Sequence, residues 1–484
     1  MPETTKKKIL FATSECAPFV KTGGLADVAA ALPKYLDPER FDVRVMLPKY
    51  LCIPEKWSSR MNYLMNFRVD LGWRNQYVGL FSLELDGITY YFIDNEFYFC
   101  GFHPYGEIYQ DVEKFAYFSK AVLVSCEMLG FIPDVIHCHD WESALVPAFL
   151  DQMRADHSDL ADVRTVFTIH NIKFQGRWGI PQVQDITGLP GHYFEGEMLE
   201  AYGDANYMKG AIVLADRVTT VSDTYAHEIQ EPFFGEGLDA VIRQYAGKLS
   251  GIVNGIDTGD FDPGSDPMIP YHYSADTFRR IKPQCKAALQ ERMGLEKDPK
   301  KMIFGIVSRL TDQKGFDLIG SVMESFADDN VQIAVLGSGD SLYENMFRYF
   351  AGQLPGRVAF SNGYDENLAR LIYAGSDAFL MPSVFEPCGL SQLISMRYGT
   401  VPIVRETGGL KDTVEPYNEY ENTGLGFSFA GIDAGELLEQ IEYAKNVYFN
   451  HKRRWNMIAE RGMRKDVSWN VSARAYERLY EELD

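Results

Sequence analysis

The chain has 484 residues, of which 46% are hydrophobic and 24% charged, and its formal net charge is −21 at pH 7. That length predicts roughly two or three domains, and the composition is ordinary for a globular protein. The acidic charge argues against a large nucleic-acid footprint, which needs a basic face, and against adsorption to an anionic membrane. A few basic side chains in a cleft remain compatible with a phosphate ligand.

The seven cysteines are scattered along the chain and form no Cys-x-x-Cys pair. This spacing argues against a disulfide framework or a zinc site and favours a reducing compartment. The first residues run into an apolar, strand-like segment without a long apolar signal core. No segment approaches the roughly 20 apolar residues that a membrane helix needs. We therefore expect a cytoplasmic protein with neither nucleic acid nor a membrane as partner.

Short apolar runs alternate with helix-period segments along the chain. The first series of expected strands lies at residues 8–13, 43–47, 89–93, 134–138, 165–169 and 217–221. The second series lies at residues 302–307, 331–337, 357–360, 378–382 and 401–405. Most of these runs are rich in Val and Ile, and their alternation with helical segments is typical of parallel α/β architecture.

A segment dense in Gly, Pro and Asp separates the two series, at residues 254–277. That composition indicates a linker or a hinge. The sequence therefore predicts an α/β fold with two Rossmann-like, doubly wound domains that face a central cleft. We expect one domain at residues 1–253, the second at 254–465 and a closing helix within 466–484.

The tetrapeptide Thr-Gly-Gly-Leu occurs twice, in KTGGLADV near the start of the chain and in ETGGLKDTV near its end. Gly23 and Gly24 follow the first expected strand, and Gly408 and Gly409 follow the last one. Ligands of doubly wound sheets bind on such strand-to-helix loops. Glycine permits close backbone approach, and free amides at a helix start attract anions. The alternative for either copy is a turn that only precedes a helix.

Two basic residues follow the first strand of the second series, in SRLTDQKG. Arg309 offers a planar fork of donors and Lys314 a compact charge, and together such groups grip a diphosphate. The alternative is a solvated loop with two surface charges.

The segment VFEPCGLSQL follows another strand of the second series. At the strand exit, the carboxylate of Glu386 is placed to accept hydrogen bonds from sugar hydroxyls. Gly389, Leu390 and Ser391 follow a turn and offer backbone amides to phosphate oxygens. The alternative is a helix start that a nearby negative charge stabilises.

Three further patterns suggest cofactors, but each is incomplete. His137, His139 and Asp140 stand at a strand exit; the two histidines share one face of the strand, but no further metal ligands are near in sequence. The Asp-Phe-Asp string at 260–262 lies in the hinge and does not extend to a calcium loop. The Gly-Ser-Gly string at 337–339 lacks the third glycine of a dinucleotide fingerprint. We therefore expect no metal and no cofactor.

Seven strings stand in the order found in bacterial glycogen synthases and plant starch synthases: KTGGLADV, HCHDW, TIHN, VNGID, SRLTDQKG, FEPCGLSQL and TGGLKDTV. The chain resembles this family over almost its whole length. The resemblance implies the GT-B architecture, with a last helix that packs back on the first domain. It also implies metal-independent transfer of glucose from ADP-glucose to the non-reducing end of an α-1,4-glucan such as glycogen or starch, with retention at the anomeric carbon.

The resemblance also assigns site residues at matching positions. The expected catalytic residues are Lys21, His170, Arg309, Lys314 and Glu386. The expected substrate-binding residues are Glu15, Gly23, Gly24, Asp27, Asp140, Asn171, Asn254, Tyr364, Cys388, Gly389, Leu390, Ser391, Thr407, Gly408 and Gly409. Among these, Lys21 resembles a contact to the donor phosphate and sugar, and Tyr364 resembles an aromatic residue that packs against the base.

One position departs from the wider pattern of two-domain transferases. Many of them place a second glutamate eight residues after the first, where this chain has Ile394; glycogen and starch synthases commonly lack it too. UDP-glucose as donor and a non-catalytic glucan-binding relative remain alternatives. The aromatic-rich stretch at residues 90–106 either stacks on sugar rings or, as is commoner, builds core.

Overall fold

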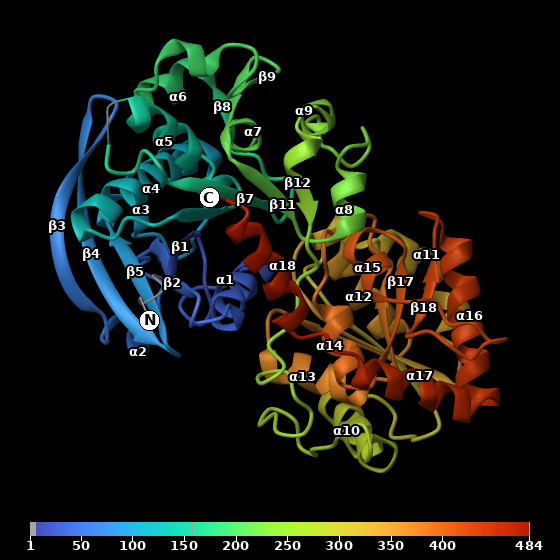
Figure 1. Ribbon diagram of the computed structural model, residues 1–484. Coiled ribbons are helices and arrows are strands. Elements are labelled where there is room, and N and C mark those ends of the chain that lie inside the picture. Colours follow the sequence, from blue (N-terminus) through green and yellow to red (C-terminus); the bar gives the residue numbers. More distant parts are fainter. Residues whose placement is uncertain (1–5, 156–157, 484) are drawn as a thin grey trace. The chain divides into compact units, whose positions relative to one another are not determined.

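The computed structural model describes residues 6–155 and 158–483. The chain divides into two compact units, each with its own hydrophobic core (Figure 1). Unit 1 runs to Asn254 and takes in the chain again from Trp469, and unit 2 is Gly255–Ser468. The predicted fold class, α/β with two Rossmann-like domains, is confirmed by the two largely parallel sheets described below.

A nine-stranded sheet forms the centre of unit 1, in the order β12-β11-β7-β6-β1-β2-β5-β4-β3. Its strands are β1 (Lys7–Ala12), β2 (Phe41–Pro48), β3 (Asn62–Leu71), β4 (Arg74–Leu85), β5 (Ile88–Asp94), β6 (Val135–His139), β7 (Arg164–Ile169), β11 (Arg217–Thr220) and β12 (Leu249–Gly251). The strands from β12 to β5 in this order are parallel. The first series of expected strands corresponds to six of them.

The antiparallel hairpin of β3 and β4 at the sheet edge was not predicted. Residues of β3 are mostly exposed or half-buried, so the strand has no continuous apolar run. Buried parallel strands are recognised by apolar residues on both faces, and a strand with one solvated face lacks that pattern. A second, three-stranded sheet contains β8 (Arg177–Gly179), β10 (Asp204–Asn206) and β9 (Glu200–Ala201).

Helices accompany the parallel strands of unit 1, as expected for strands that are buried on both faces. They are α1 (Gly24–Tyr35), α2 (Glu55–Ser58), α3 (Glu96–Phe99), α4 (Ile108–Leu129), α5 (Val146–Ala155), α6 (Ile180–Thr187), α7 (Tyr207–Leu214), α8 (Asp223–Glu228), α9 (Asp239–Gln244) and α18 (Trp469–Glu481). The longest, α4, ends at Gly130, whose φ of 63° gives the left-handed cap that glycine accommodates.

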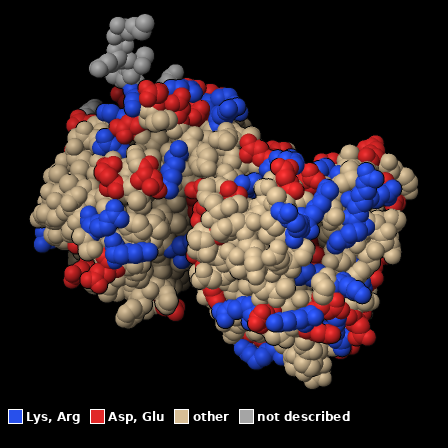
Figure 2. Space-filling model, turned by 90° about the horizontal axis from the view of Figure 1, so that it is seen from below, with Lys and Arg blue, Asp and Glu red and all other residues tan. Residues whose placement is uncertain are grey.

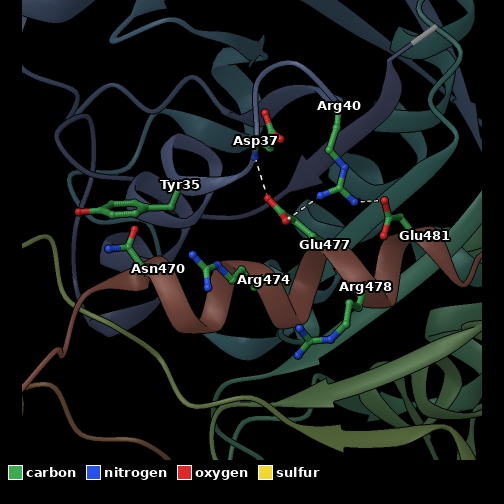
Figure 3. A pocket seen from close by; sticks show the side chains of 8 residues that line it. All are labelled: Tyr35, Asp37, Arg40, Asn470, Arg474, Glu477, Arg478 and Glu481. Carbon is green, nitrogen blue, oxygen red and sulfur yellow. Dashed lines mark hydrogen bonds and ion pairs between the residues drawn. The ribbon is translucent and has the colours of Figure 1, made fainter. Parts of the chain in front are cut away.

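The last helix, α18, packs on unit 1 beside the end of α1 and the start of β2. The Glu477 carboxylate accepts hydrogen bonds from the backbone N–H of Asp37 at 2.8 Å and from Arg40 at 3.2 Å, and Arg40 also pairs with Glu481. A pocket of about 510 Å³ lies over these contacts (Figure 3). Three arginines and three carboxylates line it together with Tyr35 and Asn470: Asp37, Arg40, Arg474, Glu477, Arg478 and Glu481. Its formal charges therefore balance.

Unit 2 contains a six-stranded, wholly parallel sheet in the order β15-β14-β13-β16-β17-β18. Its strands are β13 (Met302–Val307), β14 (Val331–Gly337), β15 (Val358–Asn362), β16 (Ala378–Met381), β17 (Val401–Arg405) and β18 (Phe427–Phe429). Its helices are α10 (Phe278–Met293), α11 (Phe316–Phe326), α12 (Ser341–Gln353), α13 (Glu366–Gly375), α14 (Ser391–Arg397), α15 (Gly408–Thr413), α16 (Ala434–Asn450) and α17 (Lys452–Arg464). All five strands expected in this half are present, and only the three-residue β18 was missed.

Charged side chains of both signs are interspersed on the face shown in Figure 2, with no continuous basic area. Within the described residues, none of the helices has the length and hydropathy to cross a bilayer.

Candidate active site

Each of the two large sheets has one point where the direction of chain crossover reverses. In unit 1 this point lies between β1 and β6, and in unit 2 it lies between β13 and β16. The loops after these strands diverge, and ligands of doubly wound sheets bind in the resulting crevice. KTGGLADV follows β1, and HCHDW spans the end of β6. SRLTDQKG and FEPCGLSQL follow β13 and β16. Four of the seven strings found in the sequence therefore lie at the switch points of the two large sheets.

The first Thr-Gly-Gly-Leu loop is held by hydrogen bonds to a buried carboxylate. Glu15 is 3% exposed and accepts hydrogen bonds from the N–H of Thr22 at 2.5 Å and from its hydroxyl at 2.7 Å. Above this anchor, Lys21 and Asp27 form a partly exposed ion pair at 2.7 Å. Gly23 is extended, with φ of −157°, and a Cβ added there would meet no atom within 4 Å. The loop thus presents an ammonium group and open space at the start of α1, which begins with Gly24.

Sequence reasoning missed Tyr105 in this anchor. Its hydroxyl lies 2.6 Å from Oε1 of Glu15 and 2.9 Å from Oγ of Ser14. Burial, helped by the nearby Glu142 and Glu15 carboxylates, raises the pKa of Tyr105 well above its ordinary value, so the hydroxyl stays protonated and can donate. The available signal was its place in the aromatic-rich stretch, but nothing in that stretch distinguishes Tyr105 from the aromatic residues around it.

Asp140 joins the two strand exits of β6 and β7. Its Oδ1 accepts hydrogen bonds from the N–H groups of His170 at 2.7 Å and Asn171 at 3.3 Å. Its φ of 52° lies in a region that residues other than glycine rarely adopt. Strained backbone of this kind clusters at functional sites. Burial raises the pKa of Asp140 to about 7 against the opposing effect of these two hydrogen bonds. The structure thus brings together three residues that sequence reasoning selected.

His170 stands just beyond β7, and its ring contacts a second histidine. Its Nε2 lies 3.0 Å from Nδ1 of His139. Burial lowers the pKa of His170 to about 3, and it lowers the pKa of His139 and His137 as well. His137 is held by Tyr480 at 2.7 Å and Thr168 at 2.6 Å. These rings are therefore neutral near pH 7, and the contacts of His137 account for it without a metal.

Asn254 ends the first segment of unit 1. Its side chain is buried, and its Oδ1 has no hydrogen-bond partner among the residues that the structure describes. Its role in the site therefore stays a prediction.

Unit 2 places two expected catalytic residues in direct contact. Lys314 Nζ lies 2.6 Å from Oε2 of Glu386, and both side chains are largely buried. The same oxygen accepts a hydrogen bond from Ser383 Oγ at 2.9 Å. Gly315 allows the approach of the two loops, since a Cβ there would lie 2.0 Å from the carbonyl oxygen of Pro382. The second carboxylate oxygen of Glu386 makes neither of these two bonds.

Ser383 and Arg405 were not expected from the sequence. Arg405 is 5% exposed and donates from Nε to the carbonyl oxygen of Ser383 at 2.8 Å, to Val384 and to Ala430 at 2.9 Å. It thereby fixes the backbone that leads to Glu386. An arginine at the end of an apolar strand gives no sequence signal for such a role.

The second Thr-Gly-Gly-Leu loop is packed against the loop of Glu386. A Cβ at Gly408 would lie 2.0 Å from the carbonyl oxygen of Glu386, and one at Gly409 would lie 2.2 Å from that of Cys388. The N–H of Gly409 donates to the carbonyl oxygens of Glu386 at 3.2 Å and Pro387 at 3.1 Å, and Thr407 is fully buried. These glycines therefore allow two loops to touch, and the amide of Gly409 is already engaged.

The start of α14 is ordered by side chains around it. Gln392 donates to the carbonyl oxygens of Cys388 at 3.0 Å and Gly389 at 2.9 Å, and Ser391 Oγ lies 3.0 Å from the hydroxyl of Tyr373. Gly389 has φ of 72°, which favours glycine. Leu390 caps the helix without a side-chain hydrogen bond.

Two expected residues stand out from the surface of unit 2. Arg309 is exposed, and its guanidinium makes no hydrogen bond or ion pair within the described part of the chain. Tyr364 is 77% exposed between β15 and α13, where Asp365 caps the helix by accepting from the N–H of Leu368. Neither side chain belongs to the core, and their ligand contacts stay predictions. The described residues contain no group of three or more His, Cys, Asp or Glu arranged to hold a metal ion.

Comparisons with known proteins agree with this geometry. Residues 8–244 match the family described as the starch synthase catalytic domain, and residues 289–461 match group 1 of the glycosyl transferases. A glycogen synthase of Lachnospira eligens is 57% identical over 99% of this chain and 100% of its own length. A glycogen synthase of Bacillus cereus is 48% identical over 98% of this chain and 99% of its own.

Solved structures give the same result. The catalytic domain of starch synthase IV from Arabidopsis thaliana, bound to ADP and acarbose, superposes with a TM-score of 0.92 at 32% identity, covering 99% of each chain. The fold and the loops at the switch points define a glycosyltransferase with two Rossmann-like domains. Within that class, the chain belongs to the glycogen and starch synthase family.

Proposed function

We propose that this protein transfers glucose from ADP-glucose to the non-reducing end of an α-1,4-glucan, with retention at the anomeric carbon and release of ADP. The contact of Lys314 with Glu386 at the switch point of unit 2 carries the proposal. A phosphorylated sugar offers a negative phosphate to the ammonium group and hydroxyl groups to the carboxylate. The ADP and acarbose bound to the Arabidopsis starch synthase support adenine as the base and a glucan as acceptor.

In this mechanism, Lys314 and Arg309 hold the departing diphosphate. The bond between C1 of glucose and the phosphate oxygen breaks, and its electron pair leaves with ADP. Charge that develops on that oxygen is stabilised by preorganised positive groups, which is commonly the largest single contribution to catalysis. Because the two basic side chains supply this charge, the proposed reaction requires no divalent ion.

Glu386 orients the glucose through its hydroxyl groups. Its Oε2 is fixed by Lys314 and Ser383, which leaves Oε1 to accept from the sugar. The glucose gains oxocarbenium character as the bond breaks, as in glycoside chemistry generally. The acceptor hydroxyl then forms the new bond to C1 from the same face, and its proton leaves with ADP. Phosphate contacts are assigned to the loop of Gly389, Leu390 and Ser391.

Unit 1 supplies the remaining groups of the proposal. Lys21 contacts the donor phosphate, and the open space beside Gly23 admits the sugar nucleotide. His170, held by Asp140 and His139, contacts the transferred glucose. Tyr105 fixes Glu15 and, through it, the loop that carries Lys21.

The decisive experiment measures transfer of labelled glucose to glycogen from ADP-glucose and from UDP-glucose side by side, each with and without a chelator. We expect incorporation from ADP-glucose that survives complete chelation. Preference for UDP-glucose would keep the reaction but change the base assignment around Tyr364. Loss of activity on chelation, with rescue by a divalent ion, would overturn the metal-free mechanism. Glucan binding without transfer from either donor would show a non-catalytic relative.

A further inference from the structure

The contact between His139 and His170 links two neighbouring strand exits. His139 ends β6 and pairs in register with Thr168 of β7, two residues before His170. The centroids of the two rings lie 5.3 Å apart, and Nδ1 of His139 lies 3.0 Å from Nε2 of His170. His139 is fully buried, while His170 is half-buried. His139 therefore contacts the ring of His170 from the buried side, and His170 is the ring that the proposed reaction uses.

The ring of His139 is fixed in place by its surroundings. Phe11 stacks on the ring with centroids 5.2 Å apart. The backbone of His139 is held by Ser143, whose Oγ accepts from the backbone N–H at 2.7 Å and donates to the backbone carbonyl oxygen at 2.9 Å. Burial keeps both histidines neutral. A neutral imidazole has one N–H and one bare nitrogen, so one of the two rings must donate and the other accept.

The unshared nitrogen of His139 decides between the two arrangements. If His170 donates, His139 carries its proton on Nε2, which is buried without a hydrogen-bond partner among the described residues. If His139 donates from Nδ1, that buried Nε2 is a bare acceptor. Orphaned buried N–H groups are the rarer of the two in folded proteins. In the second arrangement, His170 carries its proton on Nδ1, which bonds to no other described residue.

We propose that His139 is a positioning residue that donates its Nδ1–H to Nε2 of His170 and so holds His170 as the Nδ1–H tautomer. The N–H of His170 is then directed at a hydroxyl oxygen of the transferred sugar. This inference rests on the proposed function for the identity of the sugar, but the tautomer is a property of the free protein. The partner of one ring nitrogen commonly sets the proton position on the other.

The tautomer is read directly by correlating ring protons with ring nitrogens in the full chain labelled with ¹⁵N-histidine. The signal of His170 is identified by its loss in His170→Gln. We expect a protonated Nδ1 and a bare Nε2 in the wild type. In His139→Phe we expect Nε2 to gain the proton, and in His139→Asn, whose amide N–H replaces the Nδ1–H, we expect the wild-type pattern.

Transfer kinetics provide the second measurement. His139→Phe is expected to lower kcat/KM about 10- to 100-fold, the usual effect of losing a residue that orients a site group, and His139→Asn to recover most of it. A proton on Nε2 of wild-type His170, or an unchanged tautomer in His139→Phe, would overturn the proposal. If His139→Phe does not fold, the wild-type and His139→Asn spectra decide. A wild type that transfers no glucose would contradict the proposed function but leave the tautomer measurement intact.

Discussion

The two Thr-Gly-Gly-Leu loops share a sequence but differ in what surrounds them. A side chain at Gly23 would meet open space, whereas side chains at Gly408 and Gly409 would collide with the backbone of the Glu386 loop. The first loop is held by a buried carboxylate, and the second by backbone contact with another loop. The same tetrapeptide therefore exposes a backbone edge in unit 1 and permits tight loop packing in unit 2. Glycine serves both purposes because it lacks a Cβ.

The largest expected effect tests the charge that unit 2 supplies. Lys314→Met removes the ammonium group from Oε2 of Glu386 and leaves a buried carboxylate with Ser383 as its remaining donor in this contact. We expect turnover to fall by on the order of 10²–10³, as for loss of one preorganised group at a developing charge. Steady-state rates with ADP-glucose measure the effect. The matched control is Lys300→Met, which changes an exposed lysine of the same unit. A near-normal rate would remove Lys314 from the mechanism.

The second prediction separates the two glycine loops directly. Gly409→Ala places a Cβ 2.2 Å from the carbonyl oxygen of Cys388, so the loops must move apart. Overpacking of this kind costs about 1–3 kcal/mol of the free energy of unfolding. Gly23→Ala meets no atom and has an extended φ, so its effect on stability should stay within about 0.5 kcal/mol.

Gly23→Ala should affect activity although it leaves stability nearly unchanged. Its methyl group occupies space that we assign to the sugar nucleotide, so we expect a higher KM for ADP-glucose in a fully folded protein. Urea unfolding and steady-state kinetics on both variants measure the two effects. Equal destabilisation by the two substitutions would contradict the structural contrast between the loops.

Acid should affect unit 1 more than unit 2. Burial holds the pKa of His170 near 3 and lowers that of His137 and His139, whereas an unfolded histidine titrates near 6.5. Between these values the three histidines bind more protons in the unfolded chain than in the folded one, so they lower stability as pH falls below about 6.5. The raised pKa of two buried carboxyl groups, Asp140 and Glu142, acts in the opposite direction and offsets part of this loss. The described residues of unit 2 include no buried histidine.

Hydrogen exchange of the full chain at pH 7.5 and pH 5, corrected for intrinsic exchange rates, measures this difference. We expect peptides of β6 and β7 to lose protection at pH 5 while those of β13 and β16 change little. His137→Phe should reduce the loss, because it removes one of the buried groups that bind protons only after unfolding. A uniform loss across both units would contradict the assignment to these histidines.

Much of the fold could be predicted from the sequence, because buried parallel strands have continuous apolar runs in the sequence. The runs at 302–307 and 331–337 match β13 and β14 residue for residue. β3 has no such run, since most of its residues are exposed or half-buried. Strand-exit residues such as Glu386 and Lys314 were selected because the loop after a parallel strand is a general place for ligands, and their roles stay predictions.

The supporting residues could not be found in the same way. Tyr105 contacts Glu15 across 90 positions of sequence, and His139 contacts His170 across 31. Neither contact leaves a local pattern, because a hydroxyl or a second ring is placed by the packing of separate strands. The engagement of the Gly409 amide was also invisible, since a free and an occupied N–H have the same sequence.

The smallest expected effects come from single hydroxyl groups that hold the two anchoring glutamates. Tyr105→Phe removes a hydrogen bond of 2.6 Å from Glu15 in unit 1, and Ser383→Ala removes one of 2.9 Å from Glu386 in unit 2. Each glutamate keeps its other donors, so each loss should cost about 1 kcal/mol, which is roughly fivefold in rate. Because Glu15 acts through the Lys21 loop, Tyr105→Phe should raise the KM for ADP-glucose. Because Glu386 touches the reacting sugar in our mechanism, Ser383→Ala should lower kcat. If both variants changed the same kinetic constant, the two glutamates would not have the separate roles that their surroundings indicate.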